Sequence, residues 1–310
     1  MEKQDRIYVA GNETILGRAV ADQLQRQGYT NLIGTSSCEP NLTDGKEVDR
    51  FFRETRPDYV FLTAGKAGGI KANQLYPADF LLDNLLVGCH VIHSAHRYGS
   101  KKLLYFASSC SYPRLCRQPM QTDALMSGPL EPTNEAYALA KIAGIKLCQA
   151  YRQQYGADMV SVIPADVFGP GDEFGSESSH VVPALIGRIH EAKLTGADSV
   201  TVWGSGAAQR DFIFVDDVVD AALFVMEKFS PPEPINIGGS AAVSIRELAE
   251  LIKAMVGYGG VLQFDASKPD GMPVKVLDSS RLQTMGWRPR TTLRTGLEKT
   301  YNWFLETRLS

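Results

Sequence analysis

The sequence lacks the features that would direct a protein of 310 residues to a membrane or to nucleic acid. No apolar run approaches the roughly 20 residues that span a bilayer, and residues 1–5 lead into a candidate strand rather than an apolar signal region. The formal net charge of −3 provides no electrostatic basis for binding nucleic acid or an anionic membrane surface. We therefore expect a cytoplasmic protein with no membrane and no nucleic-acid partner.

Cysteine is scarce, and its spacing suits neither a disulfide framework nor a zinc site. The five cysteines are odd in number, scattered, and free of any pair separated by two positions: Cys38, Cys89, Cys110, Cys116 and Cys148. This pattern is typical of free thiols in a reducing compartment. His90, His93 and His96 recur along one predicted helix, but the first and last lie about 240° apart around its axis. They cannot bind one metal from a common face, so no metal site is predicted.

What the sequence does contain is a repeated alternation of strand and helix patterns. Helices are expected near residues 45–55, 78–98 and 181–192, and apolar runs of strand length fall near residues 6–10, 31–34, 58–64, 103–108 and 159–164. Repeated β-α-β units predict an α/β fold, a Rossmann-like doubly wound parallel sheet. After residue 170 the pattern loosens, so we expect a dinucleotide-binding domain over 1–170 and a smaller C-terminal substrate-binding lobe over 171–310. Ligands would bind in the cleft between them.

The first strand runs into a glycine turn of the kind that binds dinucleotides. A glycine makes the tight turn, and the N-terminus of the following helix would face a pyrophosphate. Thr14 stands where the usual pattern has a second glycine, so the backbone would approach the phosphates less closely unless the Thr14 hydroxyl contacts them. Residues 35–37, after the second strand, carry neither the acid typical of NAD sites nor the arginine typical of NADP sites. The expected cofactor residues are Gly11, Thr14, Ile15, Leu16 and Gly17.

A hydroxyl, a phenol and an ammonium group follow in an order that suits redox chemistry at a carbonyl. Ser108 ends an apolar strand, where open α/β sheets bind ligands. Tyr137 and Lys141 are four residues apart, so they share one helix face. The ammonium would then lower the pKa of the phenol. Ser108 and Tyr137 would hydrogen-bond the carbonyl oxygen while a hydride is delivered to carbon.

Longer motifs point to a known family. They cover nearly the whole chain and comprise residues 68–70, 76–80, 108–113, 131–148, 179–185, 202–206 and 265–271. On these motifs the chain resembles the extended short-chain dehydrogenase/reductase family, and within it the bifunctional enzymes that act on GDP-4-keto-6-deoxy-D-mannose. The resemblance implies 3,5-epimerisation through an enolate, followed by hydride reduction of the 4-keto group to give GDP-L-fucose. It also implies NADPH as cofactor, a GDP-sugar as substrate and a homodimer formed through two long helices.

The resemblance further implies specific roles for residues of this chain. Cys110 and His180 would serve as the base and acid on opposite faces of the sugar. Ser108 and Tyr137 would bind the 4-oxygen, and Lys141 would also hold the nicotinamide ribose. The contacts to diphosphate and guanosine would come from Arg188, Trp203, Arg210, Asp270 and Lys275.

Two departures from the family pattern concern charge. Asn12, Glu13 and Thr14 replace a His-Arg-Gly turn whose arginine contacts the 2′-phosphate of NADPH, so Glu13 would repel that phosphate and NADH becomes possible. Asp166 replaces an amide near the substrate diphosphate. Its carboxylate would either turn away or signal an altered substrate.

Alternative functions therefore remain open. The first is a related reductase or epimerase that acts on a different nucleotide-linked 4-keto sugar or heptose. A 4,6-dehydratase is disfavoured, because such relatives carry an Asp-Glu pair where this chain has Ser109 and Cys110. The second is a non-catalytic dinucleotide-binding sensor, which the altered turn favours and the retained catalytic positions oppose.

Overall fold

A computed structural model describes residues 1–34, 39–175, 179–239 and 241–309 of the chain. Residues 35–37, on which the sequence-based expectation about the second strand end rests, lie outside the described residues. Among the described helices, none combines the length and apolar character needed to cross a membrane.

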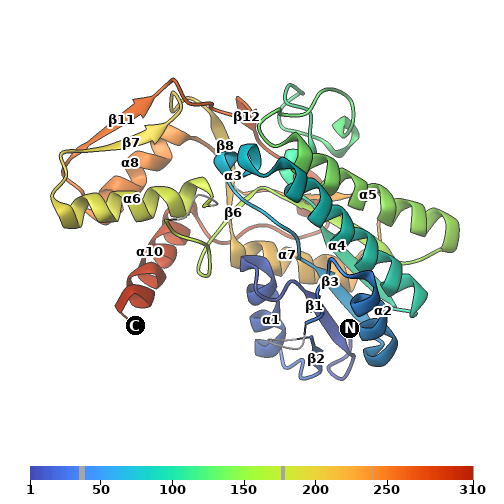
Figure 1. The fold of residues 1–310 in the computed structure, drawn as a ribbon. Helices are drawn as coiled ribbons and strands as arrows, with labels where there is room; N and C mark the ends of the chain where they lie inside the picture. Colours follow the sequence, from blue (N-terminus) through green and yellow to red (C-terminus); the bar gives the residue numbers. More distant parts are fainter. Residues whose placement is uncertain (35–38, 176–178, 240, 310) are drawn as a thin grey trace.

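The larger lobe is built on a parallel sheet (Figure 1). Its six strands follow the order β2-β1-β3-β4-β5-β9 and comprise β1 (Ile7–Ala10), β2 (Leu32–Ile33), β3 (Tyr59–Leu62), β4 (Lys102–Phe106), β5 (Met159–Pro164) and β9 (Ile235–Ile237). Nearly all side chains of the central strands are buried, because helices cover both faces of the sheet. This architecture confirms the predicted Rossmann-like α/β class.

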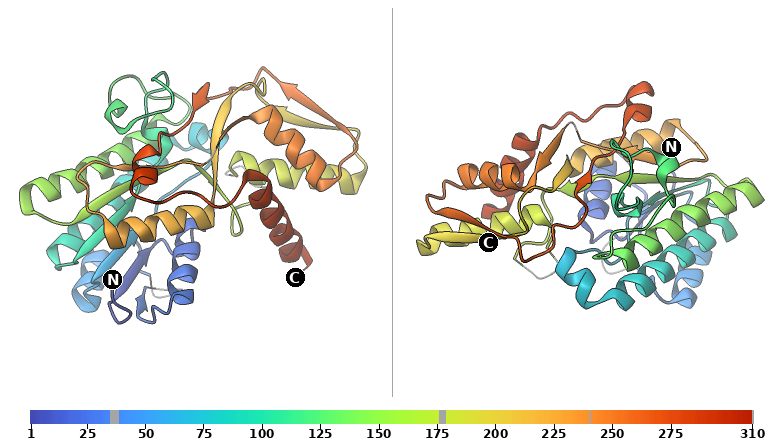
Figure 2. Two further views of the ribbon diagram at one scale, coloured as in Figure 1. Left: turned by 180° about the vertical axis from the view of Figure 1, so that it is seen from behind. Right: turned by 90° about the horizontal axis from the view of Figure 1, so that it is seen from above.

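Two groups of helices enclose this sheet (Figures 1 and 2). On one side α1 (Ile15–Arg26) packs against α7 (Val215–Lys228), which also contacts β4 and β5. On the other side α4 (Pro77–Arg97) lies between α2 (Gly45–Thr55) and α5 (Glu135–Tyr155). The short helix α3 (Ile70–Leu75) precedes α4. The helices predicted near 45–55 and 78–98 are thus present at almost the predicted bounds.

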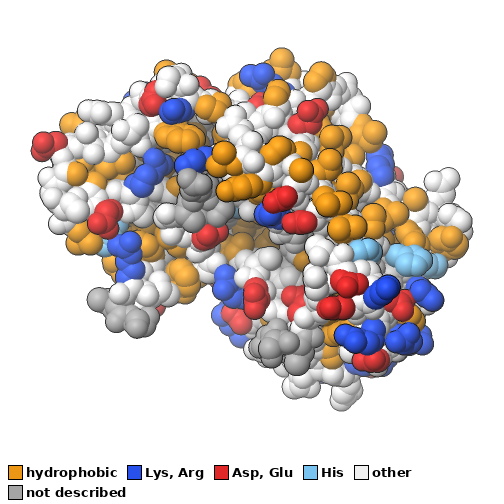
Figure 3. Space-filling view, viewed as in Figure 1, with side chains coloured by type: hydrophobic (Ala, Val, Ile, Leu, Met, Phe, Trp, Pro, Cys, Tyr) orange, Lys and Arg blue, Asp and Glu red, His pale blue; other side chains and the backbone are white. Residues whose placement is uncertain are grey.

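Hydrophobic side chains gather on the outer face of the α4–α5 pair (Figure 3). Leu82 of α4 is 56% exposed and Leu139 of α5 is 46% exposed. Tyr155, at the end of α5, is also exposed. This apolar face is covered by no element among the described residues.

The smaller lobe surrounds a second hydrophobic core. Its central strand, β8 (Gln209–Phe214), pairs with β6 (Asp166–Phe168), β10 (Ala242–Ser244) and β12 (Val274–Lys275). A separate pair joins β7 (Ser199–Trp203) to β11 (Val261–Asp265). The helices of this lobe are α6 (Val181–Thr195), α8 (Ile245–Val256) and α10 (Leu293–Leu309). The short helix α9 (Ser280–Thr284) packs instead against β9 at the edge of the large sheet. The helix predicted near 181–192 corresponds to α6.

At one crossing, the chain passes from the small lobe to the large lobe without a loop. Strand β8 of the small lobe ends at Phe214, and α7 of the large lobe begins at Val215. After α7, β9 joins the edge of the large sheet beside β5. Segments that follow residue 170 therefore contribute to both lobes.

Candidate active site

The glycine turn lies at the point where the strand order of the large sheet reverses, between β1 and β3. Gly11 has a φ of 88°, and a Cβ there would lie 2.5 Å from Cα of Ala64. A Cβ on Gly17 would lie 2.0 Å from the carbonyl oxygen of Gly11. Only glycine allows this close packing. It places the N-terminus of α1 at the crevice where open α/β sheets bind nucleotides.

Thr14 serves as the N-cap of α1. Its hydroxyl accepts the N–H of Gly17 at 2.9 Å and donates to the carbonyl oxygen of Gly11 at 2.8 Å. The first of these bonds satisfies a backbone N–H of the first turn that has no partner within the helix. Because the single hydroxyl hydrogen is used within the turn, Thr14 does not replace the missing glycine by donating to a phosphate.

The Glu39 side chain contacts this turn, and the sequence did not predict it. Its Oε1 accepts the N–H of Gly11 at 2.6 Å and the hydroxyl of Tyr8 at 3.0 Å. Burial raises the pKa of Glu39. The signal that could have found it is an acid shortly after the second strand, which is where dinucleotide sites carry one. With the exposed Glu13, it gives the turn two carboxylates and no neighbouring arginine in the tripeptide 12–14.

The predicted hydroxyl, thiol and phenol converge where β4 meets α5. Ser108 follows β4, and its Oγ accepts the N–H of Cys110 at 3.2 Å. Cys110 lies in a short 3-10 helix, η2 (Ser109–Ser111), which packs against α5. Tyr137 lies in the first turn of α5, and Nδ2 of Asn134 donates to Sγ of Cys110 at 3.1 Å. Asn134 was not predicted as a site residue.

Lys141 lies beside Tyr137 but does not have the predicted effect on its pKa. Its Nζ is 5.7 Å from the Tyr137 ring centroid and 3.3 Å from the carbonyl oxygen of Phe106, to which it donates. Burial raises the pKa of Tyr137, and the neighbouring Cys110 adds to this, while a hydrogen bond from Ser108 opposes it. The prediction of a lowered Tyr137 pKa is therefore wrong, because desolvation dominates. Burial also lowers the pKa of Lys141 to about 8.

A buried polar corner next to Lys141 suits the hydroxyl groups of a nicotinamide ribose. Oδ1 of Asn84 is buried and has no hydrogen-bond partner among the described residues. A Cβ on Gly65, whose φ is 133°, would lie 2.2 Å from this oxygen and 3.4 Å from Nζ of Lys141. The corner thus combines an unused acceptor with a buried cation, and the residues present fit a nicotinamide cofactor. Asn84 was missed because nothing in the sequence indicates which side chain faces Lys141.

His180 is not brought into contact with the cluster. It is the exposed N-cap residue of α6 and makes no side-chain cap bond. Among the described residues, no hydrogen bond or ion pair joins it to Cys110. Asp172 lies near it, and burial raises the pKa of this acid while the nearby His180 lowers it.

The substrate-side cations share one carboxylate. Nζ of Lys275 lies 2.5 Å from Oδ1 of Asp166, and Nε of Arg210 lies 3.8 Å from Oδ2. Arg210 is only 8% exposed and also donates to three carbonyl oxygens, those of Gln209, Asp270 and Met272. Asp166 therefore does not turn away. It pairs with both cations.

The other predicted substrate residues line the outer part of the small lobe. The Asp270 carboxylate accepts the N–H and the hydroxyl of Ser205, each at 2.8 Å. Arg188 is exposed and donates to carbonyl oxygens of Ala184 and Thr201. Trp203, at the end of β7, is 40% exposed, so it is not a core residue.

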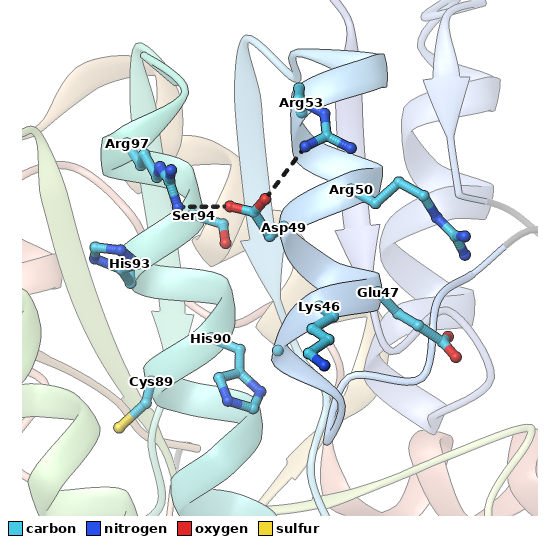
Figure 4. A pocket seen from close by; sticks show the side chains of 11 residues that line it. Lys46, Glu47, Asp49, Arg50, Arg53, Cys89, His90, His93, Ser94 and Arg97 are labelled. Carbon is cyan, nitrogen blue, oxygen red and sulfur yellow. Dashed lines mark hydrogen bonds and ion pairs between the residues drawn. The ribbon is translucent and has the colours of Figure 1, made fainter.

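A cavity of about 700 Å³ between α2 and α4 includes none of the predicted site residues (Figure 4). Its walls are polar, and Asp49 pairs there with Arg53 and Arg97. His90 and His93 line it, whereas His96 stacks on Tyr155. Within the described part of the chain, no group of three His, Cys, Asp or Glu side chains could hold a metal ion.

Comparison with known proteins gives the family. A model of the NAD dependent epimerase/dehydratase family matches residues 7–238. GDP-L-fucose synthase 1 of Arabidopsis thaliana is 50% identical over 305 residues, which cover 98% of this chain and 94% of that protein.

Two solved structures share the whole fold. A GDP-6-OMe-4-keto-L-xylo-heptose reductase from C. jejuni has a TM-score of 0.94 at 32% identity and covers 99% of both chains. A GDP-L-fucose synthetase from Naegleria fowleri bound to NADP has a TM-score of 0.90 at 27% identity, covering 100% of this chain and 97% of that one. The predicted resemblance and the prediction of a nicotinamide-dependent enzyme are confirmed, and the chain belongs to the NAD dependent epimerase/dehydratase family.

Proposed function

We propose that the chain converts GDP-4-keto-6-deoxy-D-mannose to GDP-L-fucose by epimerisation at C3 and C5 followed by reduction at C4. The observation that carries this proposal is the convergence of Ser108, Cys110 and Tyr137 at the end of β4. A reductase needs only the hydroxyl and the phenol, whereas the thiol adds a proton acceptor. The name and near-complete coverage of the Arabidopsis relative support the same activity.

Epimerisation uses the acidity of the carbons that flank a carbonyl. Cys110, as a thiolate, removes a proton from one such carbon, and the electron pair moves to O4 to give an enolate. Hydrogen bonds from Ser108 and Tyr137 stabilise that oxygen. His180 then protonates the carbon from the opposite face. His180 is the exposed N-cap residue of α6. We assign it the role of proton donor to the sugar carbon, which requires access to the sugar and no contact with Cys110.

Reduction reuses the same hydrogen bonds. The nicotinamide cofactor supplies the hydride to C4 when bound. Tyr137 donates its proton to O4, and its raised pKa keeps it protonated until that oxygen becomes basic. Lys141 and Asn84 would hold the nicotinamide ribose, and Gly11, Thr14, Ile15, Leu16 and Gly17 would form the pyrophosphate turn.

We propose NADPH as the usual cofactor, with NADH also accepted. The NADP-bound relative supports NADPH. Glu13 and Glu39 oppose it, since each places a carboxylate at the turn. A phosphate near two carboxylates loses electrostatic stabilisation, whereas ribose hydroxyls can donate to them.

On the substrate side, we assign Arg210 and Lys275 to the diphosphate and Trp203, Arg188 and Asp270 to the outer nucleoside. Buried Arg210 and half-buried Lys275, paired with one carboxylate, leave a net positive charge for an anion. Trp203 is exposed enough to stack on a base.

We further propose a homodimer that covers the apolar face of α4 and α5. Leu82 of α4 and Leu139 of α5 are both exposed, and hydrophobic side chains gather over this pair of helices (Figure 3). Large exposed apolar patches mark interaction surfaces. Light scattering of the purified chain would test this.

A second candidate, reduction without epimerisation of a different GDP-linked 4-keto sugar, is favoured by one observation. The structure with a TM-score of 0.94 is that of a heptose reductase. Asp166 would then reflect an altered substrate.

The decisive experiment is turnover of GDP-4-keto-6-deoxy-D-mannose with NADPH and with NADH in separate reactions, with the product identified by NMR. GDP-L-fucose supports the proposal and ranks the cofactors. A reduced product that keeps the C3 and C5 configuration supports the second candidate. Consumption of neither cofactor contradicts both.

A further inference from the structure

We propose that Asn134 is a positioning residue that stabilises the Cys110 thiolate through an N–H···S hydrogen bond, so that the sulfur serves as the base in epimerisation. The inference rests on the proposed function of Cys110. It concerns a residue that neither the sequence nor the comparisons assign to the site.

Asn134 occupies a helix cap without capping the helix. It is the N-cap residue of α5, yet its side chain makes no bond to the backbone of the first turn. Its Nδ2 instead donates to Sγ of Cys110 at 3.1 Å. Asparagine at this position normally satisfies an orphan N–H of the helix, so here the side chain has exchanged that role for a contact with the thiol.

Hydrogen bonds on both sides hold the backbone of Asn134 in place. Its backbone N–H donates to the carbonyl oxygen of Glu131 at 3.2 Å, and its carbonyl oxygen accepts the N–H of Ala138 at 3.0 Å. The Glu131 carboxylate accepts the N–H and hydroxyl of Thr133 and pairs with Arg114 at 3.2 Å. The turn before α5 therefore fixes the backbone from which the Asn134 side chain reaches Cys110.

The other end of the same amide makes no bond. Oδ1 of Asn134 is buried and has no hydrogen-bond partner among the described residues. A buried acceptor without a partner destabilises a fold. The side chain is thus poorly explained by stability alone, and its one polar contact is with Cys110.

The contact favours negative charge on sulfur. A thiolate accepts an N–H hydrogen bond more strongly than a thiol does, because hydrogen bonds to ionised groups are the stronger ones. The N-terminus of α5, a helix of 21 residues, adds the positive end of its dipole. When Cys110 takes a proton from carbon, the electron pair of the C–H bond moves to O4, and the sulfur becomes neutral. Asn134 thus stabilises the state before proton transfer and prepares the base.

The same charge has a useful effect on Tyr137. Burial raises the pKa of Tyr137, and the neighbouring Cys110 adds to this effect. While the sulfur is charged, the phenol keeps its proton and remains a donor to O4. A charged sulfur therefore favours the protonated phenol, which is the form that donates to O4.

The test compares Asn134→Ala, Asn134→Asp and Asn134→Thr with the unaltered chain. Alkylation of Cys110 by iodoacetamide is followed by mass spectrometry of its peptide between pH 6 and 10, with no substrate present and with Cys116 in the same protein as internal reference. We expect Asn134→Ala to slow alkylation of Cys110 at pH 7 by about threefold to tenfold, and to shift its pH profile upward, with Cys116 unchanged. Asn134→Asp should slow alkylation of Cys110 further, because aspartate has the size of asparagine but places a negative charge next to the sulfur. Asn134→Thr should restore part of the rate through its hydroxyl.

Thr133→Ala is the matched control. It removes a bond to Glu131 in the same turn but touches no sulfur, so it should leave the Cys110 profile in place. If Asn134→Ala and Asn134→Asp fold and alkylate like the unaltered chain, or if Thr133→Ala matches Asn134→Ala, the inference is wrong.

A second readout links the contact to catalysis. Incorporation of deuterium at C3 and C5 of the GDP-4-keto sugar in D₂O should fall by about tenfold in Asn134→Ala, whereas reduction of already epimerised substrate should fall less. If the unaltered chain incorporates no deuterium, the proposed function fails. The alkylation profile then still decides whether Asn134 stabilises the thiolate.

Discussion

The catalytic cluster and the two places where ligand phosphates would bind differ in charge. Ser108, Cys110, Tyr137 and Lys141 include no carboxylate and have the residue types that the family pattern leads one to expect. By contrast, the glycine turn contains Glu13 and contacts Glu39. Arg210 and Lys275, the cations that we assign to the diphosphate, pair with Asp166. The comparison teaches that the residues proposed for bond making follow the family pattern, whereas Glu13 and Asp166 add negative charge to the proposed recognition sites. Changes in the cluster should therefore affect rates strongly, and changes at the acids should affect ligand preference more modestly.

The largest effect should come from Cys110→Ala. We expect deuterium incorporation at C3 and C5 to fall by about 1000-fold, because general base catalysis contributes 10² to 10⁴. Reduction of epimerised substrate should fall far less, since Ser108 and Tyr137 remain. Cys116→Ala is the control with normal exchange. Equal loss of both activities would mean that Cys110 shapes the site rather than acting as base.

Lys141→Met should lower the rate of reduction by about 100-fold, because positioned polar groups contribute on that scale.

The charge of the Lys141 ammonium predicts a pH dependence of reduction in the unaltered chain. Burial lowers the pKa of Lys141 to about 8, so the ammonium is present below that pH and lost above it. Reduction, measured as kcat/KM from pH 6 to 10, should decline as the pH rises through about 8. Lys141→Arg should remove this decline, and a decline that persists there would assign it to another group.

Lys141→Met should also stabilise the folded chain at pH 7 by about 1 to 3 kcal/mol, because a buried charge lacking a close counter-ion is costly. The sign follows from the pKa, which is lowered from 10.5 to about 8 on folding. The unfolded chain binds this proton more tightly, so the cost is full below pH 8 and disappears as the pH rises past 10.5. Urea unfolding at pH 7 and pH 10 measures the difference. A variant that is less stable at pH 7 would contradict it.

Glu13→Arg should shift cofactor preference toward NADPH by about tenfold, because arginine pairs with a phosphate and a carboxylate repels it. Glu13→Gln removes only the repulsion and should give a smaller shift. The dissociation constants of NADPH and NADH, measured by fluorescence titration, provide the ratio. An unchanged ratio would direct attention to Glu39, whose carboxylate already bonds the Gly11 amide.

The smallest effect should come from Asp166→Asn, which keeps the shape of the side chain and frees Arg210 and Lys275 from a competing anion. We expect GDP to bind about threefold to tenfold more tightly, with a steeper dependence on salt. Calorimetric titration with GDP alone measures this. Asp216→Asn, at an exposed position of α7, removes the same charge elsewhere and should change little. Weaker binding to Asp166→Asn would instead make Asp166 a direct ligand contact.

The sequence predicted the large lobe well because its elements follow one another with a regular period. Strands such as β5 are continuous apolar runs, and helices such as α2 have a strong polar and apolar face. The return of α7 and β9 to the large sheet was not foreseen, since residues 215–237 resemble any other helix and strand. Pairing of β9 with β5 joins segments about 70 residues apart, which local patterns do not encode.

The candidate site was predicted only where its residues carry a motif. Tyr137 and Lys141 were placed correctly by their spacing, but the effect of burial on their pKa values depends on tertiary packing and was missed. Glu39, Asn84 and Asn134 were missed for a related reason. Each is recognised only by what its polar end faces across the fold.

The direct passage from β8 into α7 fixes the distance between two parts of the proposed substrate site. Arg210 lies in β8, five residues before α7 begins, and α7 packs on β4, whose end carries Ser108. No loop between them can absorb an error in length. Inserting one residue after Arg210 would advance the strand by about 3.3 Å and reverse the side of the sheet that its side chain faces. With Arg210 at the diphosphate and Ser108 at the carbonyl, as proposed, the number of residues in one strand would set the distance between the two substrate groups.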